Sequence, residues 1–280
     1  MLCAVGDLVE DVVVRVNQSI RPGTDTTATI ERRPGGSAAS VAREAARFGP
    51  ARFIGRVGDD AAGVALVAGL LHDSVDARVQ RAGRTGTIVV LVDESGERTM
   101  FPDRGACTEL DDVDDGWLTD VDVLHLPSYS IFSEPIGATC SHLVAVVRRA
   151  GGRVSIDASS TGVLADVGVA EASRRFAELR PDVLFANSDE AALLDLVDWP
   201  GVVVVKRGAA PVEVVVNSRR RNVPVPALVS GIDTTGAGDA FAGGFLAAWT
   251  TGTDVEAAAT AGVASATRLL RSRAAVVSRS

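Results

Sequence analysis

Lysine is almost absent from this chain of 280 residues: Lys206 is the only one, and the other basic side chains are arginines. A P-loop requires the string G-x-x-x-x-G-K-[ST], which the sequence does not contain. Cysteine is also scarce, with three residues that lie far apart, at Cys3, Cys107 and Cys140. An odd and scattered set of thiols predicts reduced cysteines without a disulfide framework, and therefore a cytoplasmic location.

Histidine, long apolar runs and positive charge are equally in short supply. The three histidines lie far apart, and Cys140 with His142 is too small a group for a metal site. No apolar run reaches the ~18 residues of a membrane span, and the first residues lack the basic start of a signal peptide. The formal net charge of -8 leaves no basic surplus for nucleic acid. We therefore expect no nucleic acid and no membrane among the partners.

Apolar residues, by contrast, are abundant enough for a large core, since 46% of the chain is hydrophobic. No linker or internal repeat divides the sequence, so residues 1–280 are expected to form a single domain. The string G-x-G-x-x-G is missing after the first apolar strand, which argues against a dinucleotide-binding oxidoreductase.

From Val121 onward, short apolar segments alternate with longer amphipathic ones. Val183–Phe185 and Val202–Val205 are continuously apolar, as buried parallel strands are. This alternation predicts a doubly wound, mostly parallel sheet with helices on both faces. The predicted strands are Val121–Leu126, Arg153–Asp157, Asp182–Ala186, Val202–Val205 and its hairpin mate Val212–Val216. The predicted helices are Glu134–Ala150, Val169–Leu179, Asp189–Leu196, Ala240–Trp249 and Val255–Leu270.

Two β-ribbons, at about residues 12–33 and 86–101, interrupt this alternation. Val12–Val16 is strongly β-forming. Thr87–Val92 and Glu97–Phe101 predict a hairpin around the turn at residues 93–96. The pattern alone shows only that these ribbons do not belong to the alternating strands and helices.

The most informative stretch is a glycine-rich loop that opens at Gly231 and turns into the apolar helix Ala240–Trp249. Gly236 and Gly238 let the backbone approach a ligand closely. A helix that is apolar on nearly every side is expected to be buried. Its start offers free N–H groups and a positive dipole end, which suit a phosphate.

The same helix start carries one acid, Asp239, and two candidate capping residues, Thr234 and Thr235. An anion-binding loop beside a carboxylate supplies what phosphoryl transfer to a hydroxyl needs: charge stabilisation and an acceptor for the proton. The alternative is that the glycines only make a tight turn and that Asp239 only complements the helix dipole.

Four motifs, in the same order along the chain, resemble those of the ribokinase-like, PfkB-type carbohydrate kinases. Asp233–Phe241 (Asp-Thr-Thr-Gly-Ala-Gly-Asp-Ala-Phe) resembles the family's C-terminal signature, and Pro34–Ser40 (Pro-Gly-Gly-Ser-Ala-Ala-Ser) resembles its N-terminal glycine pair. Asn187–Glu190 matches the family's N-x-x-E motif, and Lys206–Gly208 resembles a strand-end turn that holds the nucleotide. The resemblance implies an ATP-dependent sugar kinase with a ribokinase-like fold, in which the two ribbons form a small β-sheet lid over the sugar site.

For the reaction, the resemblance implies that Asp239 takes the proton from a primary hydroxyl of a sugar or sugar acid. That hydroxyl then attacks the γ-phosphate of ATP in line. The amides of Gly236, Ala237 and Gly238 would stabilise the charge that develops.

On the acceptor side, Asp11 corresponds to the family's acid that hydrogen-bonds sugar hydroxyls, since a carboxylate can accept two of them. Gly35 and Gly36 would bring the backbone close to the sugar. Ser40 stands where the family often has asparagine, and it keeps a shorter hydrogen-bonding group. Arg104 ends the second ribbon, where it either faces the acceptor or forms a surface ion pair.

On the nucleotide side, the resemblance implies contacts from Asn187, Lys206, Gly208 and Thr235, and an action of Glu190 on Mg²⁺ mostly through water. Taken without the resemblance, the N-x-x-E motif is also a helix cap with acids at the positive end. The turn at Lys206 is then a strand end with solvated charges.

Some relatives also bind a monovalent cation such as K⁺, through the positions of Asp233 and Thr235 together with a segment near the C-terminus. Here Thr267–Arg271 lacks the Gly-Ala pair often seen in that segment, and Pro211 stands where the family often has a second glycine. These departures from the family pattern fall at positions that the resemblance assigns to the monovalent cation and to the adenine pocket. The resemblance also leaves room for a homodimer that forms through the lid.

Two alternatives to a sugar kinase stay open at this stage. The same scaffold phosphorylates nucleosides, although only 4% of the residues are aromatic, which favours a sugar. A catalytically silent protein of this fold would only bind a ligand, but the chain retains Asp239 and both glycines of the loop.

Overall fold

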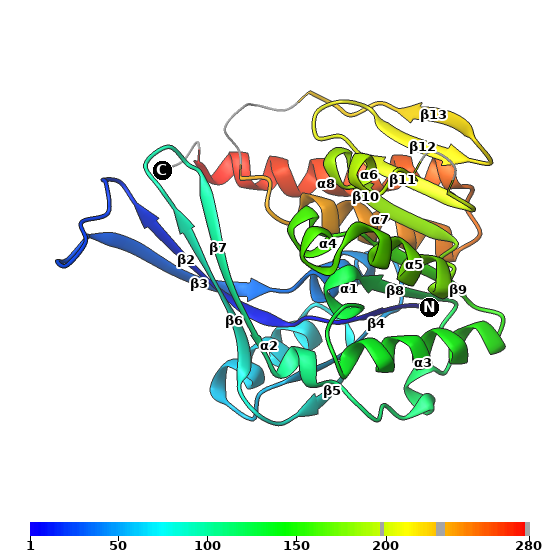
Figure 1. Ribbon diagram of the computed structural model, residues 1–280, viewed down its shortest axis with the longest axis horizontal. Coiled ribbons are helices and arrows are strands. Elements are labelled where there is room, and N and C mark those ends of the chain that lie inside the picture. The colour runs from blue at the N-terminus through cyan, green and yellow to red at the C-terminus, as the bar shows by residue number, and fades with distance from the viewer. Residues whose placement is uncertain (197–198, 228–232, 278–280) are drawn as a thin grey trace.

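A nine-stranded sheet runs through the computed structural model, which describes residues 1–196, 199–227 and 233–277 (Figure 1). Its strands are β1 (Leu2–Val5), β4 (Ala51–Val57), β5 (Asp76–Arg81), β8 (Val123–Pro127), β9 (Arg153–Asp157), β10 (Val183–Asn187), β11 (Val202–Lys206), β12 (Val212–Val216) and β13 (Arg219–Val223). They lie in the order β13-β12-β11-β10-β9-β8-β1-β4-β5. All neighbours from β11 to β5 are parallel, and only β12 and β13 run antiparallel. The predicted doubly wound, mostly parallel sheet is confirmed.

Helices cover both faces of this sheet (Figure 1). They are α1 (Ser37–Ala46), α2 (Ala61–His72), α3 (Ile136–Arg149), α4 (Thr161–Val167), α5 (Val169–Leu179), α6 (Ser188–Leu193), α7 (Ala237–Thr250) and α8 (Val255–Val277), with 3₁₀ turns η1 (Ala106–Glu109), η2 (Asp115–Leu118) and η3 (Ser128–Ser130). Alternate residues of β1 enter different cores. Leu2 and Ala4 pack with α1, α2, α7 and α8, whereas Cys3 and Val5 pack with α3 and α5. Within the described ranges, no helix is long and apolar enough to cross a membrane.

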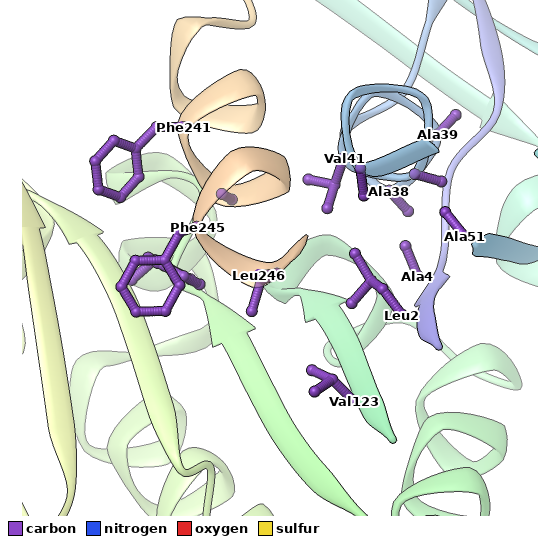
Figure 2. Packing of buried hydrophobic residues seen from close by; sticks show 14 of the residues in the cluster. Leu2, Ala4, Ala38, Ala39, Val41, Ala51, Val123, Phe241, Phe245 and Leu246 are labelled. Atoms are coloured by element: carbon purple, nitrogen blue, oxygen red, sulfur yellow. The ribbon is translucent and has the colours of Figure 1, made fainter. Parts of the chain in front are cut away.

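Helix α7 is buried on nearly every side, as its apolar sequence predicts. Two glycines let the flanking helices approach it. A Cβ on Gly243 would lie 2.8 Å from the carbonyl oxygen of Val41 in α1, and one on Gly244 would lie 2.2 Å from Ser265 Oγ in α8. Figure 2 shows Val41 of α1 and Leu246 of α7 entering the same apolar core. This packing places the start of α7 beside the start of α1.

A second, smaller sheet extends to one side of the main sheet (Figure 1). Its strands are β2 (Val9–Val16), β3 (Ala28–Gly35), β6 (Thr85–Val92) and β7 (Arg98–Gly105), in the order β3-β2-β6-β7. Strands β2 and β6 are parallel, and the other two pairs are antiparallel. The strands reach beyond the ribbons expected at residues 12–33 and 86–101, so Asp11 and Arg104 belong to this sheet.

Local patterns do not predict every element. Helix α4 and the edge strands β5 and β13 are not predicted from the sequence: α4 has only seven residues, and the two strands are largely charged or polar. The helix predicted over Asp189–Leu196 is shorter, because α6 ends at Leu193. The last predicted helix, Val255–Leu270, is longer, because α8 continues to Val277. That extension carries a residue, Arg273, which contacts the glycine-rich loop.

Candidate active site

The loop before α7 brings the predicted phosphate-binding glycines to the start of a buried helix. Gly236 is the N-cap residue and has a left-handed backbone with φ of 72°, which glycine adopts without strain. No side chain caps this helix, so the prediction that Thr234 or Thr235 caps it is wrong. The Thr235 hydroxyl donates instead to the carboxylate of Asp233, at 2.6 Å. Gly231, where the predicted loop opens, lies outside the described residues.

Asp239, the candidate general base, meets the start of α1. The hydroxyl of Ser37 donates to Oδ1 of Asp239 at 2.7 Å. Burial raises the pKa of Asp239 to about 7; the Ser37 hydrogen bond opposes this shift, the charge of Asp157 adds to it, and Lys206 opposes it. Ser40 is the serine predicted for the site in this segment, but Ser37 is the one that contacts the Asp239 carboxylate.

The only lysine of the chain lies against the glycine loop. A Cβ on Gly238 would be 3.3 Å from Lys206 Nζ. Lys206 ends β11 and forms a buried ion pair with Asp157, which ends β9. Burial works to lower the pKa of Lys206, but Asp157 and Glu190 raise it above its ordinary value, so the lysine is charged. Sequence reasoning missed Asp157, although its place at the end of a predicted strand was a usable signal.

The Asn187–Glu190 motif forms a complete capping box at the start of α6. The Asn187 side chain accepts from the Glu190 amide at 2.8 Å, and Glu190 accepts in turn from the Asn187 backbone amide at 2.8 Å. The helix-cap interpretation is therefore confirmed as part of the structure. Glu190 is only 2% exposed. Burial and the charge of Asp157 raise its pKa, and Lys206 opposes this shift.

These groups line one cavity of about 820 Å³, a volume typical of small-molecule sites. The predicted residues that line it are Asn187, Glu190, Lys206, Gly208, Gly236, Ala237, Gly238 and Asp239. Its lining also includes apolar side chains, among them Val212 of β12, Val225, and Val263 and Leu270 of α8. Charged and apolar groups in one cavity suit a nucleotide, which carries phosphates and a base.

The glycine pair and Asp11 lie together beside this cavity rather than in its wall. A Cβ on Gly35 would lie 2.2 Å from Oδ1 of Asp11, and one on Gly36 would lie 2.2 Å from the carbonyl oxygen of Asp7. Gly36 also has a positive φ, 101°, so neither position accepts a larger residue. Burial raises the pKa of Asp11, and Arg33 opposes this shift. The charge of Asp11 in turn helps to raise the pKa of Asp239.

Arg104 forms an ion pair with Asp7, a residue that sequence reasoning did not assign to the site. Asp7 is only 3% exposed, so the pair is buried and does not lie on the surface. The guanidinium also stacks over Tyr129, with its Cζ 4.0 Å from the ring centroid. Tyr129 lines the cavity, so Arg104 contacts a residue of its wall without lining it itself.

Asp233 and Thr235 lie outside the lining of the cavity, in the loop that leads to Gly236. The Asp233 carboxylate pairs with Arg98 at 2.8 Å and with Arg33 at 3.5 Å, both from the small sheet. Burial alone would raise the pKa of Asp233, but the Thr235 hydrogen bonds and the nearby arginines hold it well below its usual range.

A carboxylate and the N-terminus of a helix line one cavity of nucleotide size, and these are groups that phosphoryl transfer needs. The protein is thus of the class of kinases with a ribokinase-like fold. Over residues 1–278 the chain matches the pfkB family of carbohydrate kinases, and it belongs to this family. It is therefore an ATP-dependent carbohydrate kinase, as its motifs predict.

Known proteins of similar sequence are sugar kinases. An ATP-dependent ribose-1-phosphate kinase of Halopiger xanaduensis is 34% identical over 266 residues, which cover 89% of this chain and 84% of that protein. A fructokinase of Klebsiella pneumoniae is 32% identical over 240 residues, which cover 76% of each chain.

Solved structures of similar shape confirm the ribokinase-like fold. Adenosine kinase from Sinorhizobium meliloti has a TM-score of 0.86 at 22% identity and covers 96% of this chain and 93% of its own. Ribokinase from Thermotoga maritima has a TM-score of 0.75 at 24% identity and covers 95% of this chain and 91% of its own. At such identities the likeness concerns the fold and not the substrate.

Proposed function

We propose that the protein transfers the γ-phosphate of ATP to a primary hydroxyl of a sugar or sugar acid, with Asp239 as the general base. The observation that carries the proposal is the position of Asp239, in the first turn of α7 on the wall of the cavity. A general base works best when its pKa lies near the working pH. Burial raises the pKa of Asp239 to about 7, which meets this condition.

In the proposed reaction, the acceptor hydroxyl gives its proton to Oδ2 of Asp239 as its oxygen attacks the γ-phosphate in line. Ser37 holds Oδ1 at 2.7 Å, so the carboxylate is oriented before the acceptor binds. The amide of Ala237 donates to the carbonyl of Thr234 at 3.0 Å. Stabilisation of the developing charge therefore falls mainly on the amides of Gly236 and Gly238.

Mg²⁺ bound with the nucleotide would supply charge neutralisation at the phosphates. In the part of the chain that the structure describes, no group of three or more acids, histidines or cysteines could hold a metal by itself. Glu190 on the cavity wall fits an ion that keeps several waters and is held largely by phosphate oxygens. Asn187, Lys206 and Gly208 line the same wall and would contact the nucleotide.

Replacing Glu190 with glutamine is expected to raise the Mg²⁺ concentration needed for half-maximal rate, because a carboxylate that acts through water is lost. Glutamine keeps an oxygen that can accept from the Asn187 amide, so the capping box survives. The measurement is a Mg²⁺ titration of the initial rate. Asp189→Asn is the matched control, since Asp189 is an exposed acid in the same helical turn. Identical titrations of Glu190→Gln and wild type would leave the motif as a helix cap only.

The pH profile is expected to follow Asp239. Because its pKa is about 7 and only the ionised form accepts a proton, acceptor kcat/KM at saturating MgATP should fall as the pH drops below 7. The decline should approach about tenfold per pH unit. Asp157→Asn removes a charge that raises this pKa, so its acidic limb should shift to lower pH. If the acidic limb of the kcat/KM profile lies at the same pH in Asp157→Asn as in wild type, a group other than Asp239 controls the profile.

The acceptor is proposed to be a sugar rather than a nucleoside. Relatives at 30% identity or more are named for sugar or sugar-phosphate substrates, whereas the adenosine kinases resemble this chain only in fold. A coupled assay of ADP release should therefore respond to a sugar, a sugar acid or a sugar phosphate and not to adenosine. Release with adenosine alone would favour a nucleoside kinase. If a folded protein that binds ATP releases no ADP with any of these acceptors, a catalytically silent ligand-binding protein is favoured.

The small sheet is proposed to act as a lid of the single domain, closing over the acceptor beside Asp11. The exposed apolar side chains Ile30, Met100 and Phe101 on its strands suit a homodimer formed through this lid. Light scattering during size-exclusion chromatography measures the mass in solution. A monomer at micromolar concentration would remove the dimer from the proposal.

A further inference from the structure

The loop before α7 is tied through its backbone to the C-terminal helix. Arg273 of α8 donates from Nη1 to the carbonyl oxygen of Asp233 at 2.8 Å and to that of Thr235 at 2.5 Å. The same nitrogen lies 3.9 Å from Oδ1 of Asp233. Two carbonyl oxygens and one carboxylate oxygen therefore converge on a single cationic nitrogen.

The residues present do not fit the monovalent cation that the family resemblance implies at Asp233 and Thr235. Backbone carbonyls are the oxygens that replace the hydration shell of a K⁺ ion. Here both carbonyls already accept from Arg273, so a cation would have to displace the guanidinium.

The charges around the loop act in the same direction. Arg98 of β7 and Arg33 of β3 also face the Asp233 carboxylate, at 2.8 and 3.5 Å. Together with Arg273, three guanidinium groups surround this carboxylate. Since like charges repel at such distances, these surroundings disfavour a further cation.

We propose that Arg273 supplies from within the chain the positive charge for which some relatives use a monovalent cation, and that it positions the anion-binding amide of Gly236. The kinetic part of this proposal rests on the proposed function. The C=O and N–H of a trans peptide point in opposite directions. Holding the Thr235 carbonyl towards Arg273 therefore turns the Gly236 N–H away from it, and Gly236 lines the cavity. Arg273 is a positioning residue that acts through this peptide.

The first test compares the wild-type enzyme in K⁺ and in tetramethylammonium buffers of equal ionic strength. Two quantities are measured, the turnover number and the thermal midpoint of unfolding. Both are expected to be the same in the two buffers, because Arg273 already fills the place of the cation. The thermal midpoint needs no acceptor, so it tests the inference even if the kinase assay fails.

The second test replaces Arg273 with methionine, which removes the charge and keeps a side chain of moderate length. The turnover number should fall about 10- to 100-fold, as it does when groups that orient a site are lost. The acceptor KM should change little, and Arg273→Lys should recover part of the loss because it restores a cation. Arg271→Met, an exposed position on the same helix, is the control and should behave as wild type.

Two results would overturn the inference. One is a wild-type enzyme that K⁺ activates or stabilises relative to tetramethylammonium. The other is an Arg273→Met enzyme that turns over as fast as wild type. Failure of the proposed function would give a different result. ADP release would be absent in every buffer, whereas the thermal midpoint of the wild-type protein would still be the same with and without K⁺.

Discussion

Replacing Asp239 with asparagine is expected to reduce turnover by about 10²- to 10⁴-fold or more, the usual effect of removing a general base. Asparagine has nearly the same shape and can accept the hydrogen bond that Ser37 donates to Oδ1. It cannot take the proton of the acceptor hydroxyl. The loss should therefore appear in the chemical step and leave ATP binding unchanged.

The same variant is expected to be at least as stable as wild type at pH 8. Burial holds the pKa of Asp239 at about 7 in the folded chain, above the ordinary carboxyl value of 3.8. The folded state thus binds this proton more tightly than the unfolded state, and that stabilisation is lost as the pH rises towards 7. Asparagine removes the buried charge that remains at pH 8.

The measurements are single-turnover kinetics, calorimetric titration of ATP and thermal unfolding at pH 8. A folded Asp239→Asn enzyme that binds ATP and turns over at a near-normal rate would remove Asp239 from the mechanism. A variant that has lost ATP affinity would instead show that the carboxylate organises the phosphate site.

Replacing Asp11 with alanine is expected to raise the acceptor KM about 30- to 4,000-fold with little change in the KM for ATP. Loss of a charged partner from a closed site costs ~2–5 kcal/mol, and each ~1.4 kcal/mol is a factor of ten. Asp11 lies on β2 of the small sheet, packed over Gly35 and outside the lining of the nucleotide cavity. The effect should therefore fall on one substrate only.

Glu10→Ala provides the matched control, because Glu10 precedes Asp11 on the same strand and pairs with Arg32 instead. Steady-state kinetics against both substrates separate the two positions. If Asp11→Ala weakened ATP and spared the acceptor, the acceptor and nucleotide sides of the cleft would be reversed.

The local pattern of apolar residues along the sequence was sufficient to predict much of this architecture. Helix α7 follows from the apolar run Ala240–Trp249, and strands β10 and β11 follow from short apolar runs. Most residues of these segments are buried, so nearly every position is apolar and contributes to the signal. Edge strand β13, with Arg219 to Arg221 in succession, carries no such signal because one side meets solvent.

The contacts within the site depend on strand order, which no local pattern reveals. Asp157 and Lys206 can pair because β9 and β11 lie on either side of β10. Ser37 reaches Asp239 because Gly243 lets α1 pack closely on α7. The expected cap at Thr235 failed for a local reason, since its hydroxyl donates to the carboxylate of Asp233, two residues earlier.

The hydrogen bond between Ser37 and Asp239 joins residues 202 positions apart in the chain. During synthesis, the glycine pair, the small sheet and much of the cavity wall are all made before α7 leaves the ribosome. The proposed base is thus among the last parts of the site to be translated. Under the proposed mechanism, a nascent chain that has not yet reached Asp239 cannot transfer the phosphoryl group.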